Sequence, residues 1–350
     1  MYKKIFMGIA AAAALTLVSC SSDDLNSLSD NSSKNEAISF DGYLGRSAVS
    51  VKGSRGSVLE IADLQASKDG FGVFGNYSEG TSTAYGTNLF ENVTVTYKTS
   101  AWTYSPLKYW STEGHIDFLA YAPYETGKTL TNTSCIDFTV ESKAANQKDL
   151  LWANANGQTT KNISSTGNKV KFQFAHALSR LGYSVKLKES YSDATIKLKK
   201  ITLAGSADDA TKKAFYTAGT IDLSKKTKAA DLWKIPTPAN KQDFEWFSGD
   251  KQLSKTDATE NPNKEYLFVI PQDFSATTAT DELYVIVEYT IQTGATVAMT
   301  SKVYKKLDKK FEQGKAYTIN LTIGLTPIDF DAAVTPWDPA DGDININSWE

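Results

Sequence analysis

Cysteine and histidine are the residues that this chain contains least of. Its 350 residues include two cysteines, Cys20 and Cys135, and two histidines, His115 and His176. So few thiol and imidazole groups leave little material for a zinc site or a Ser-His-Asp triad. Cys135 lies in the strand-like run SCIDFTV and is expected to be a small buried residue without a disulfide partner. His176 has no other metal-ligand type beside it and is expected to be a hydrogen-bonded structural residue.

Dense positive charge and complete catalytic motifs are also missing. The 37 basic and 40 acidic residues nearly balance, and no Lys/Arg block is dense enough to bind nucleic acid. The run ending in Gly127-Lys128-Thr129 lacks the first glycine of a P-loop. SPLK and SGDK lack the partner motifs of penicillin-recognising enzymes, and DGDINI has Ile346 where a calcium loop needs glycine. The sequence therefore favours a non-enzymatic protein without cofactor or metal.

The N-terminus has the layout of a secretory signal. Lys3 and Lys4 precede an apolar run, residues 5–18, that is shorter than the roughly 20 residues needed to span a bilayer. Residues 17–20, LVSC, resemble a bacterial lipobox, in which Cys20 would carry lipid and begin the mature protein. We therefore expect a lipoprotein signal peptide over 1–19 and a flexible tether over 20–36. An ordinary signal peptide with an incidental cysteine is the alternative.

From residue 37 onward the pattern is that of an all-β protein. Runs of alternating or β-branched residues are separated by Gly, Asn, Asp, Ser and Pro clusters, which is typical of strands and turns. The runs are Val93–Tyr97, Lys169–Phe174, Thr195–Leu203, Glu265–Ile270, Leu283–Ile291 and Tyr317–Ile323. One turn of helix is expected at His176–Leu181. Chain length and strand density predict two antiparallel β-sandwich domains, 37–175 and 176–350.

An aromatic-rich stretch carries a resemblance to a known family. Trp102, Tyr104, Tyr109 and Trp110 are followed by HIDFLAYAPYE, then by Asp149-Leu150-Leu151, by FAHALS around His176, and by GKAYTINLTI. Together with the lipobox and the closing ININSWE, their order resembles the fimbrillin family of pilins and related lipoproteins. The residues themselves favour a core role for the aromatic side chains over sugar stacking.

The resemblance implies two transthyretin-like, Greek-key β-sandwich domains in an outer-membrane lipoprotein that becomes a pilus subunit. It implies that an arginine-specific protease removes the first strand and that a strand of another subunit replaces it. Ile38 and Phe40 alternate with polar residues, as expected of a half-buried first strand. Arg46 and Arg55 follow in a stretch of polar and small residues that is typical of an exposed loop.

The donor strand and the partners are expectations of the same kind. Ile344 and Ile346 alternate with asparagines near the chain end, as in a strand with one apolar face, although this tail could equally be an edge strand of its own domain. The expected partners are other pilin subunits, outer-membrane lipid through Cys20, and a host or bacterial surface receptor. The alternative is a surface lipoprotein that does not polymerise, either an anchor or tip subunit or a module that binds glycans or proteins.

Overall fold

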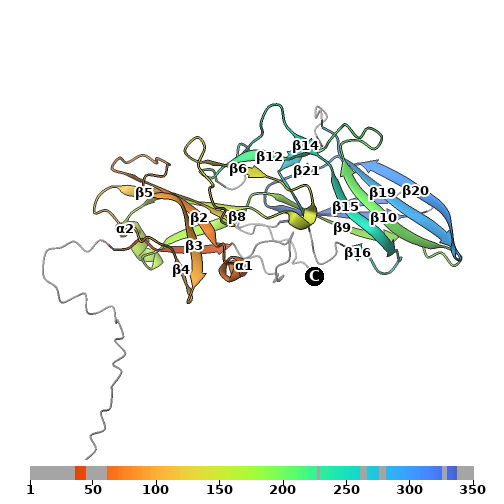
Figure 1. Ribbon diagram of the computed structural model, residues 1–350, viewed down its shortest axis with the longest axis horizontal. Coiled ribbons are helices and arrows are strands. Elements are labelled where there is room, and N and C mark those ends of the chain that lie inside the picture. The colour runs from red at the N-terminus through yellow and green to blue at the C-terminus, as the bar shows by residue number, and fades with distance from the viewer. Residues whose placement is uncertain are drawn as a thin grey trace, which may run out of the picture. The chain divides into compact units, whose positions relative to one another are not determined.

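The computed structural model describes residues 36–44, 61–226, 229–260, 266–275, 281–324 and 329–336. All of them lie in one compact unit, Glu36–Glu350. β-Strands dominate this unit, and the sheets are largely antiparallel (Figure 1). The prediction of an all-β fold is confirmed.

One large sheet is built from the first half of the described chain. Its seven strands follow the order β1-β8-β7-β5-β2-β3-β4, and every pair is antiparallel except β1 with β8, which is parallel. The strands are β1 Phe40–Leu44, β2 Phe71–Ser78, β3 Phe90–Lys98, β4 Ala101–Thr103, β5 His115–Ala122, β7 Leu151–Gln158 and β8 Val170–His176. Strand β1 therefore lies at one edge of this sheet, beside a strand about 130 residues later in the sequence.

Two further sheets use the second half of the described chain. A four-stranded sheet has the order β15-β10-β19-β20, and a five-stranded sheet has the order β16-β9-β22-β23, with β17 also paired to β9. Their strands are β9 Ser179–Leu187, β10 Thr195–Ala204, β15 Phe244–Gln252, β16 Thr259–Glu260, β17 Leu267–Val269, β19 Tyr284–Thr293, β20 Thr296–Lys306, β22 Lys315–Ile323 and β23 Asp329–Pro336.

Three small sheets and four short helices complete the described elements. In the first small sheet, β12 Ala218–Asp222 lies between β6 Cys135–Thr139 and β13 Trp233–Lys234 and pairs with both. The other two pair β11 Phe215–Tyr216 with β14 Lys241–Gln242 and β18 Gln272–Asp273 with β21 Lys310–Phe311. The helices are α1 Ile61–Ala66, α2 Thr160–Ile163, and the 3-10 turns η2 Ala144–Asn146 and η3 Ser164–Thr166. In the part of the chain that the structure describes, no helix has the length and apolar character needed to cross a membrane.

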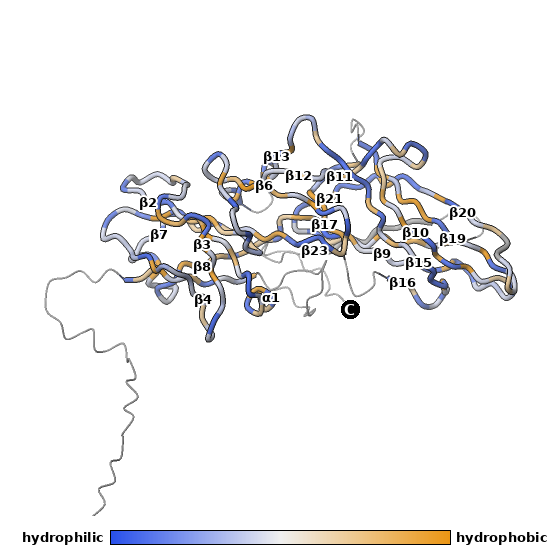
Figure 2. The backbone as a smooth tube through the Cα atoms, viewed as in Figure 1, coloured by the Kyte–Doolittle hydropathy of each residue, from blue (hydrophilic) through white to orange (hydrophobic). Residues whose placement is uncertain are grey.

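Side-chain alternation explains why these segments are strands. In β22, Tyr317, Ile319, Leu321 and Ile323 are buried, while the residues between them are half-buried. A strand with this period of two has one apolar face to bury, and hydrophobic segments recur along the strands in Figure 2. The buried side chains form two hydrophobic clusters, one with members from Ile38 to Phe174 and one with members from Phe74 to Ile323.

The six strand runs predicted from the sequence coincide with strands β3, β8, β10, β17, β19 and β22. The helical turn predicted at His176–Leu181 is wrong, because β8 ends at His176 and β9 begins at Ser179, with a bend at Leu178. Leu178 and Leu181 are both fully buried, so their spacing reflects two strands that enter one core. The division into domains 37–175 and 176–350 stays a prediction.

Candidate strand-exchange site

The first strand presents one face to the protein interior. Ile38 and Phe40 are 1% and 2% exposed, and Gly42 is buried on the same side of the strand. Ser39 and Asp41 are half-buried between them, and Tyr43 is exposed. This alternation is the one the sequence predicted, and it makes the inward face of β1 part of the core.

Phe40 sits inside a ring of aromatic side chains. Its ring centroid lies 5.5 Å from Phe90, 5.3 Å from Tyr104, 5.5 Å from Phe118 and 5.6 Å from Phe172. These rings come from β3, the segment after β4, β5 and β8, so one side chain of β1 contacts four separate parts of the sheet. Aromatic pairs at such distances each add roughly 0.5–1.5 kcal/mol beyond the area they bury.

The backbone on both sides of the strand is hydrogen-bonded. The Ile38 amide donates to the Lys108 carbonyl at 2.8 Å, and the Trp110 amide donates to the Glu36 carbonyl at 3.0 Å. Further along, β1 pairs in parallel with β8 from Phe40 opposite Val170 to Leu44 opposite Phe174. The segment 36–44 thus fills a slot between residues 108–110 and β8.

The Tyr104 hydroxyl closes this slot. It donates to the Ile38 carbonyl at 2.8 Å and accepts from the Lys108 amide at 3.2 Å. Burial raises the pKa of Tyr104 above its ordinary value of 10.0, so the hydroxyl keeps its proton and remains a donor at neutral pH. The sequence assigned Tyr104 only to the core and gave no sign of this contact.

Three of the four aromatic residues named from the sequence are placed as expected. Trp102 and Trp110 are 8% and 3% exposed and belong to the same hydrophobic cluster as Phe40, and Tyr104 packs against it. The core role predicted for Tyr109 is wrong, since its side chain is 53% exposed. Its backbone forms an isolated bridge with Ala37, which turns the side chain outward.

The remaining predicted site residues cannot be placed beside β1. Cys20, Arg46, Arg55, Ile344 and Ile346 all lie outside the described residues. Arg46 and Arg55 fall in the segment between Leu44, where β1 ends, and Ile61, where α1 begins.

Arginine is scarce in this chain, and its positions are informative. Only three of the 37 basic residues are arginines, Arg46, Arg55 and Arg180, which leaves 37 − 3 = 34 lysines. Arg180 lies in β9, is 8% exposed, and its guanidinium carbon is 4.2 Å from the centroid of the Tyr266 ring. Within the described residues, no arginine is therefore exposed in a loop.

Both histidines are bonded to buried carboxylates. His176 Nδ1 lies 2.8 Å from Asp149 Oδ2, and both side chains are buried. His115 Nε2 lies 3.0 Å from Asp117 Oδ2, and Asp117 also accepts from two backbone amides. The structural role predicted for His176 is confirmed. No group of three or more His, Cys, Asp or Glu side chains suited to a metal ion occurs among the described residues.

Cys135 is a free, buried cysteine, as the sequence predicted. Burial raises the pKa of its thiol, which keeps it in the unreactive protonated form. Its neighbour Ser134 donates to Asp222 at 2.8 Å, a buried contact between β12 and the segment before β6 that the sequence did not reveal.

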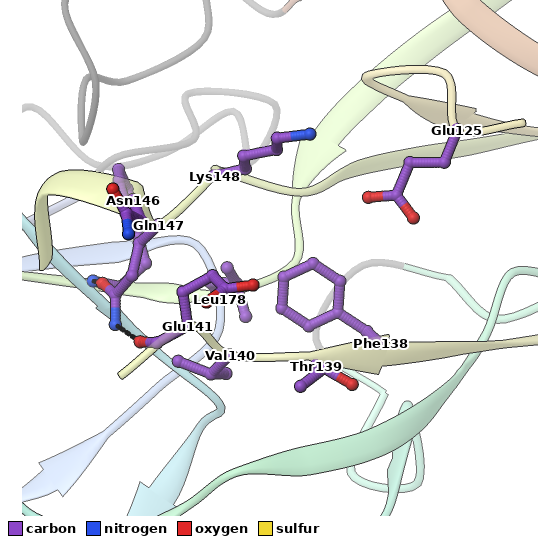
Figure 3. A pocket seen from close by; sticks show the side chains of 10 residues that line it. Glu125, Phe138, Thr139, Val140, Glu141, Asn146, Gln147, Lys148 and Leu178 are labelled. Atoms are coloured by element: carbon purple, nitrogen blue, oxygen red, sulfur yellow. Dashed lines mark hydrogen bonds between the residues drawn. The ribbon is translucent and has the colours of Figure 1, made fainter. Parts of the chain in front are cut away.

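A pocket lies near η2 and contains two carboxylates and a lysine, Glu125, Glu141 and Lys148 (Figure 3). Its one buried polar side chain, Gln147, donates to the Glu141 carbonyl at 2.9 Å and accepts from the Phe268 amide at 2.6 Å. Glu125 is paired with Lys128 at 2.7 Å. Both the amide nitrogen and the amide oxygen of Gln147 are therefore hydrogen-bonded within the protein. The slot of β1 is the better candidate for binding another chain.

Comparison with known proteins places this fold in a family. The family profile described as fimbrillin-like matches residues 60–337, most of the chain. The chain belongs to the fimbrillin-like family. Membership favours a structural, non-enzymatic protein, as predicted.

One solved structure shows the same fold, and others show a more distant similarity. A fimbrial protein from Bacteroides vulgatus superposes with a TM-score of 0.63 at 22% identity, covering 87% of this chain and 100% of that one. A candidate cell adhesion protein from Bacteroides uniformis gives 0.46 at 18% identity, with coverages of 86% and 99%. The tip fimbrial protein Mfa3 from Porphyromonas gingivalis gives 0.34 at 10% identity, with coverages of 76% and 99%. No match was found among curated proteins.

Proposed function

We propose that this fimbrillin-like protein is a subunit of a cell-surface fimbria that polymerises when strand β1 is replaced by a strand of another subunit. The observation that carries the proposal is the position of β1. It is an edge strand whose inward side chains complete the core, and the chain after it contains two of the three arginines.

Removal of β1 would leave a groove that needs to be refilled. Burying Ile38 and Phe40 contributes about 1.5–3 kcal/mol each, and their loss would expose the aromatic ring around Phe40. It would also free hydrogen-bonding groups of Lys108, Trp110 and the outer edge of β8. A sheet edge with an apolar furrow favours addition of a new strand, and pilins are among the proteins that use this mode of binding.

The distribution of arginine supports cleavage in one place. An arginine-specific protease that cuts after Arg46 or Arg55 would release β1, while Arg180 is buried in β9. Such a protease does not cut after lysine, so the 34 lysines offer it no site in the folded body. We further propose that Cys20 carries lipid and anchors the subunit in the outer membrane before cleavage, and that the assembled fimbria supports adhesion to a host or bacterial surface.

The test is a comparison of cleavage-site variants. Surface-extracted protein should begin at residue 47 or 56 by mass spectrometry, and treatment with an arginine-specific protease should produce heat-labile oligomers. Arg46→Ala combined with Arg55→Ala should leave a monomer that retains β1. Lys52→Ala, which removes a positive charge from the same segment, serves as the matched control and should assemble normally. Unimpaired assembly of the double variant would refute cleavage-gated exchange, and a retained β1 in wild type would favour a non-polymerising lipoprotein.

A further inference from the structure

The slot of β1 accepts side chains of different sizes along its length. Four positions face inward, and they hold Ile38, Phe40, Gly42 and Leu44 in that order. The first two are large, and the third is buried like Phe40 but has no side chain. If another strand occupies this slot, as proposed above, it meets the same profile.

The third position is narrow because of Phe174. A Cβ atom added to Gly42 would lie 3.1 Å from Phe174 Cε2 and 3.7 Å from Phe71 Cε1. Phe174 is fully buried, with its ring centroid 5.3 Å from Phe71 and 6.0 Å from Phe172. A ring held on two sides can shift by a few tenths of an ångström but cannot move aside for a branched side chain. Alanine or serine would fit with a small adjustment, and valine or a larger residue would not.

Residues 344–348 match residues 38–42 in the sizes of their inward side chains. ININSWE, residues 344–350, aligns with ISFDGYL, residues 38–44, without a gap. Ile344 and Ile346 fall on the two large inward positions, and Ser348 falls on the narrow one. Glu350 falls on the fourth position, that of Leu44, which is only half-buried at the end of β1, so its carboxylate can reach water. The outward positions correspond as well, with asparagines on Ser39 and Asp41 and Trp349 on Tyr43.

Other registers of this tail fail on size or polarity. A shift of two residues in one direction puts Ile346 on the Gly42 position, where its branched side chain meets Phe174. The opposite shift puts Glu350 there, which buries a carboxylate as well as overfilling the site. A shift of one residue turns the asparagines inward and the isoleucines outward.

We propose that the groove selects its incoming strand by size at the Gly42 position, with Phe174 as the residue that sets the limit. The occupant is the C-terminal heptapeptide of another copy of this chain. It lies parallel to β8 with Ile344, Ile346 and Ser348 in the places of Ile38, Phe40 and Gly42. This inference rests on the proposed strand exchange and adds to it a register and a specificity-determining residue.

The experiment measures assembly of full-length protein after cleavage by an arginine-specific protease. Ser348→Val should lower the rate and extent of assembly about fivefold or more, because an overfilled core position typically costs a factor of about five or more in binding. Asn347→Val adds the same kind of side chain on the outward face and should assemble within about twofold of wild type. Ser348→Gly should assemble at least as well as wild type.

A compensating substitution tests whether the Phe174 side chain sets the size limit. In protein with Ser348→Val, the second substitution Phe174→Leu should restore assembly, because the smaller side chain makes room for valine. If Phe174→Leu does not fold, the synthetic peptide DGDININSWE replaces that arm. Added to cleaved wild type it should block assembly, and the same peptide with Ser348→Val should not.

The outcomes separate the two levels of the proposal. If cleaved wild type does not assemble, strand exchange itself is wrong. If cleaved wild type assembles and Ser348→Val assembles equally well, the exchange stands and the size selection at Gly42 is refuted. Equal loss in Ser348→Val and Asn347→Val would also refute the register.

Discussion

At the scale of single residues, Tyr104 is the contact that ties β1 to the loop before Trp110. Its hydroxyl bonds both the Ile38 carbonyl and the Lys108 amide, two backbone groups that meet only when β1 is in place. Tyr104→Phe keeps the ring next to Phe40 and removes this bridge. A buried carbonyl left without its donor costs about 1–3 kcal/mol.

We therefore expect Tyr104→Phe to lower the melting temperature of the uncleaved protein and to speed release of β1 after cleavage. Tyr109→Phe, at the exposed tyrosine of the same loop, is the matched control and should leave both unchanged. An unchanged melting temperature in Tyr104→Phe would show that side-chain packing and the backbone hydrogen bonds hold the slot without the Tyr104 hydroxyl.

A second residue-scale prediction concerns alkaline pH. Burial raises the pKa of Tyr121 from 10.0 to about 12, and its hydroxyl donates to Asn92 Oδ1 at 2.7 Å. Because the folded-state pKa lies above the unfolded one, this contribution to stability is complete below about pH 10 and is lost as pH rises through about 12. Urea unfolding at pH 8 to 12 should show stability falling over that window. Tyr121→Phe should flatten the fall, and an equally steep fall in the variant would contradict the assignment.

At the scale of elements, the two faces of β1 should differ in energy. Phe40→Ala removes a ring that touches four others, and such truncations cost about 3–5 kcal/mol. Tyr43→Ala removes an outward side chain that is 43% exposed and bonds Gln173 Oε1 at 3.3 Å, so its cost should stay near 1 kcal/mol. Chemical denaturation of the two variants measures the difference. Similar costs would mean that the inward face contributes little to holding the strand.

The strands themselves could be read from the sequence, because a period of two is a local property. The alternation around Ile38 and Phe40 and the run Tyr317–Ile323 both gave the correct buried face. Pairing could not be read in the same way. The parallel contact of β1 with β8 joins residues about 130 positions apart, and nothing local in either strand specifies that partner or its direction.

For the candidate site too, the sequence predicted the local alternation but not the contacts between distant segments. Alternation pointed to Ile38 and Phe40, but the roles of Tyr104 and Phe174 depend on where distant segments meet. Tyr109 shows the limit of prediction from local sequence. It lies next to Trp110 in the same aromatic-rich stretch, yet its backbone bridge to Ala37 turns its side chain to solvent. At His176–Leu181, apolar spacing suggested a helix because two buried strand ends happen to have a helical period.

At the scale of the whole molecule, the lipid anchor is the step that can be tested without assembly. Metabolic labelling with a fatty acid should mark wild type and not Cys20→Ser. Cys135→Ser, at the buried cysteine, is the control and should keep the label. Label in Cys20→Ser would refute the lipobox interpretation, and the protein would then be a secreted one with an ordinary signal peptide.

The parallel pairing of β1 with β8 also fixes what cleavage does to the energetics. No hairpin joins the two strands, so β1 is bound to the rest of the chain only through the segment that contains Arg46 and Arg55. In the uncut chain this tether keeps β1 at an effective concentration of about millimolar or higher near its own groove. A single cut removes this tether. The fragment that contains β1 then stays with the lipid on Cys20 while the folded body can move away, so the concentration of β1 near its groove falls. Because β1 then rarely rebinds its own groove, assembly outside the cell can proceed in one direction without nucleotide hydrolysis.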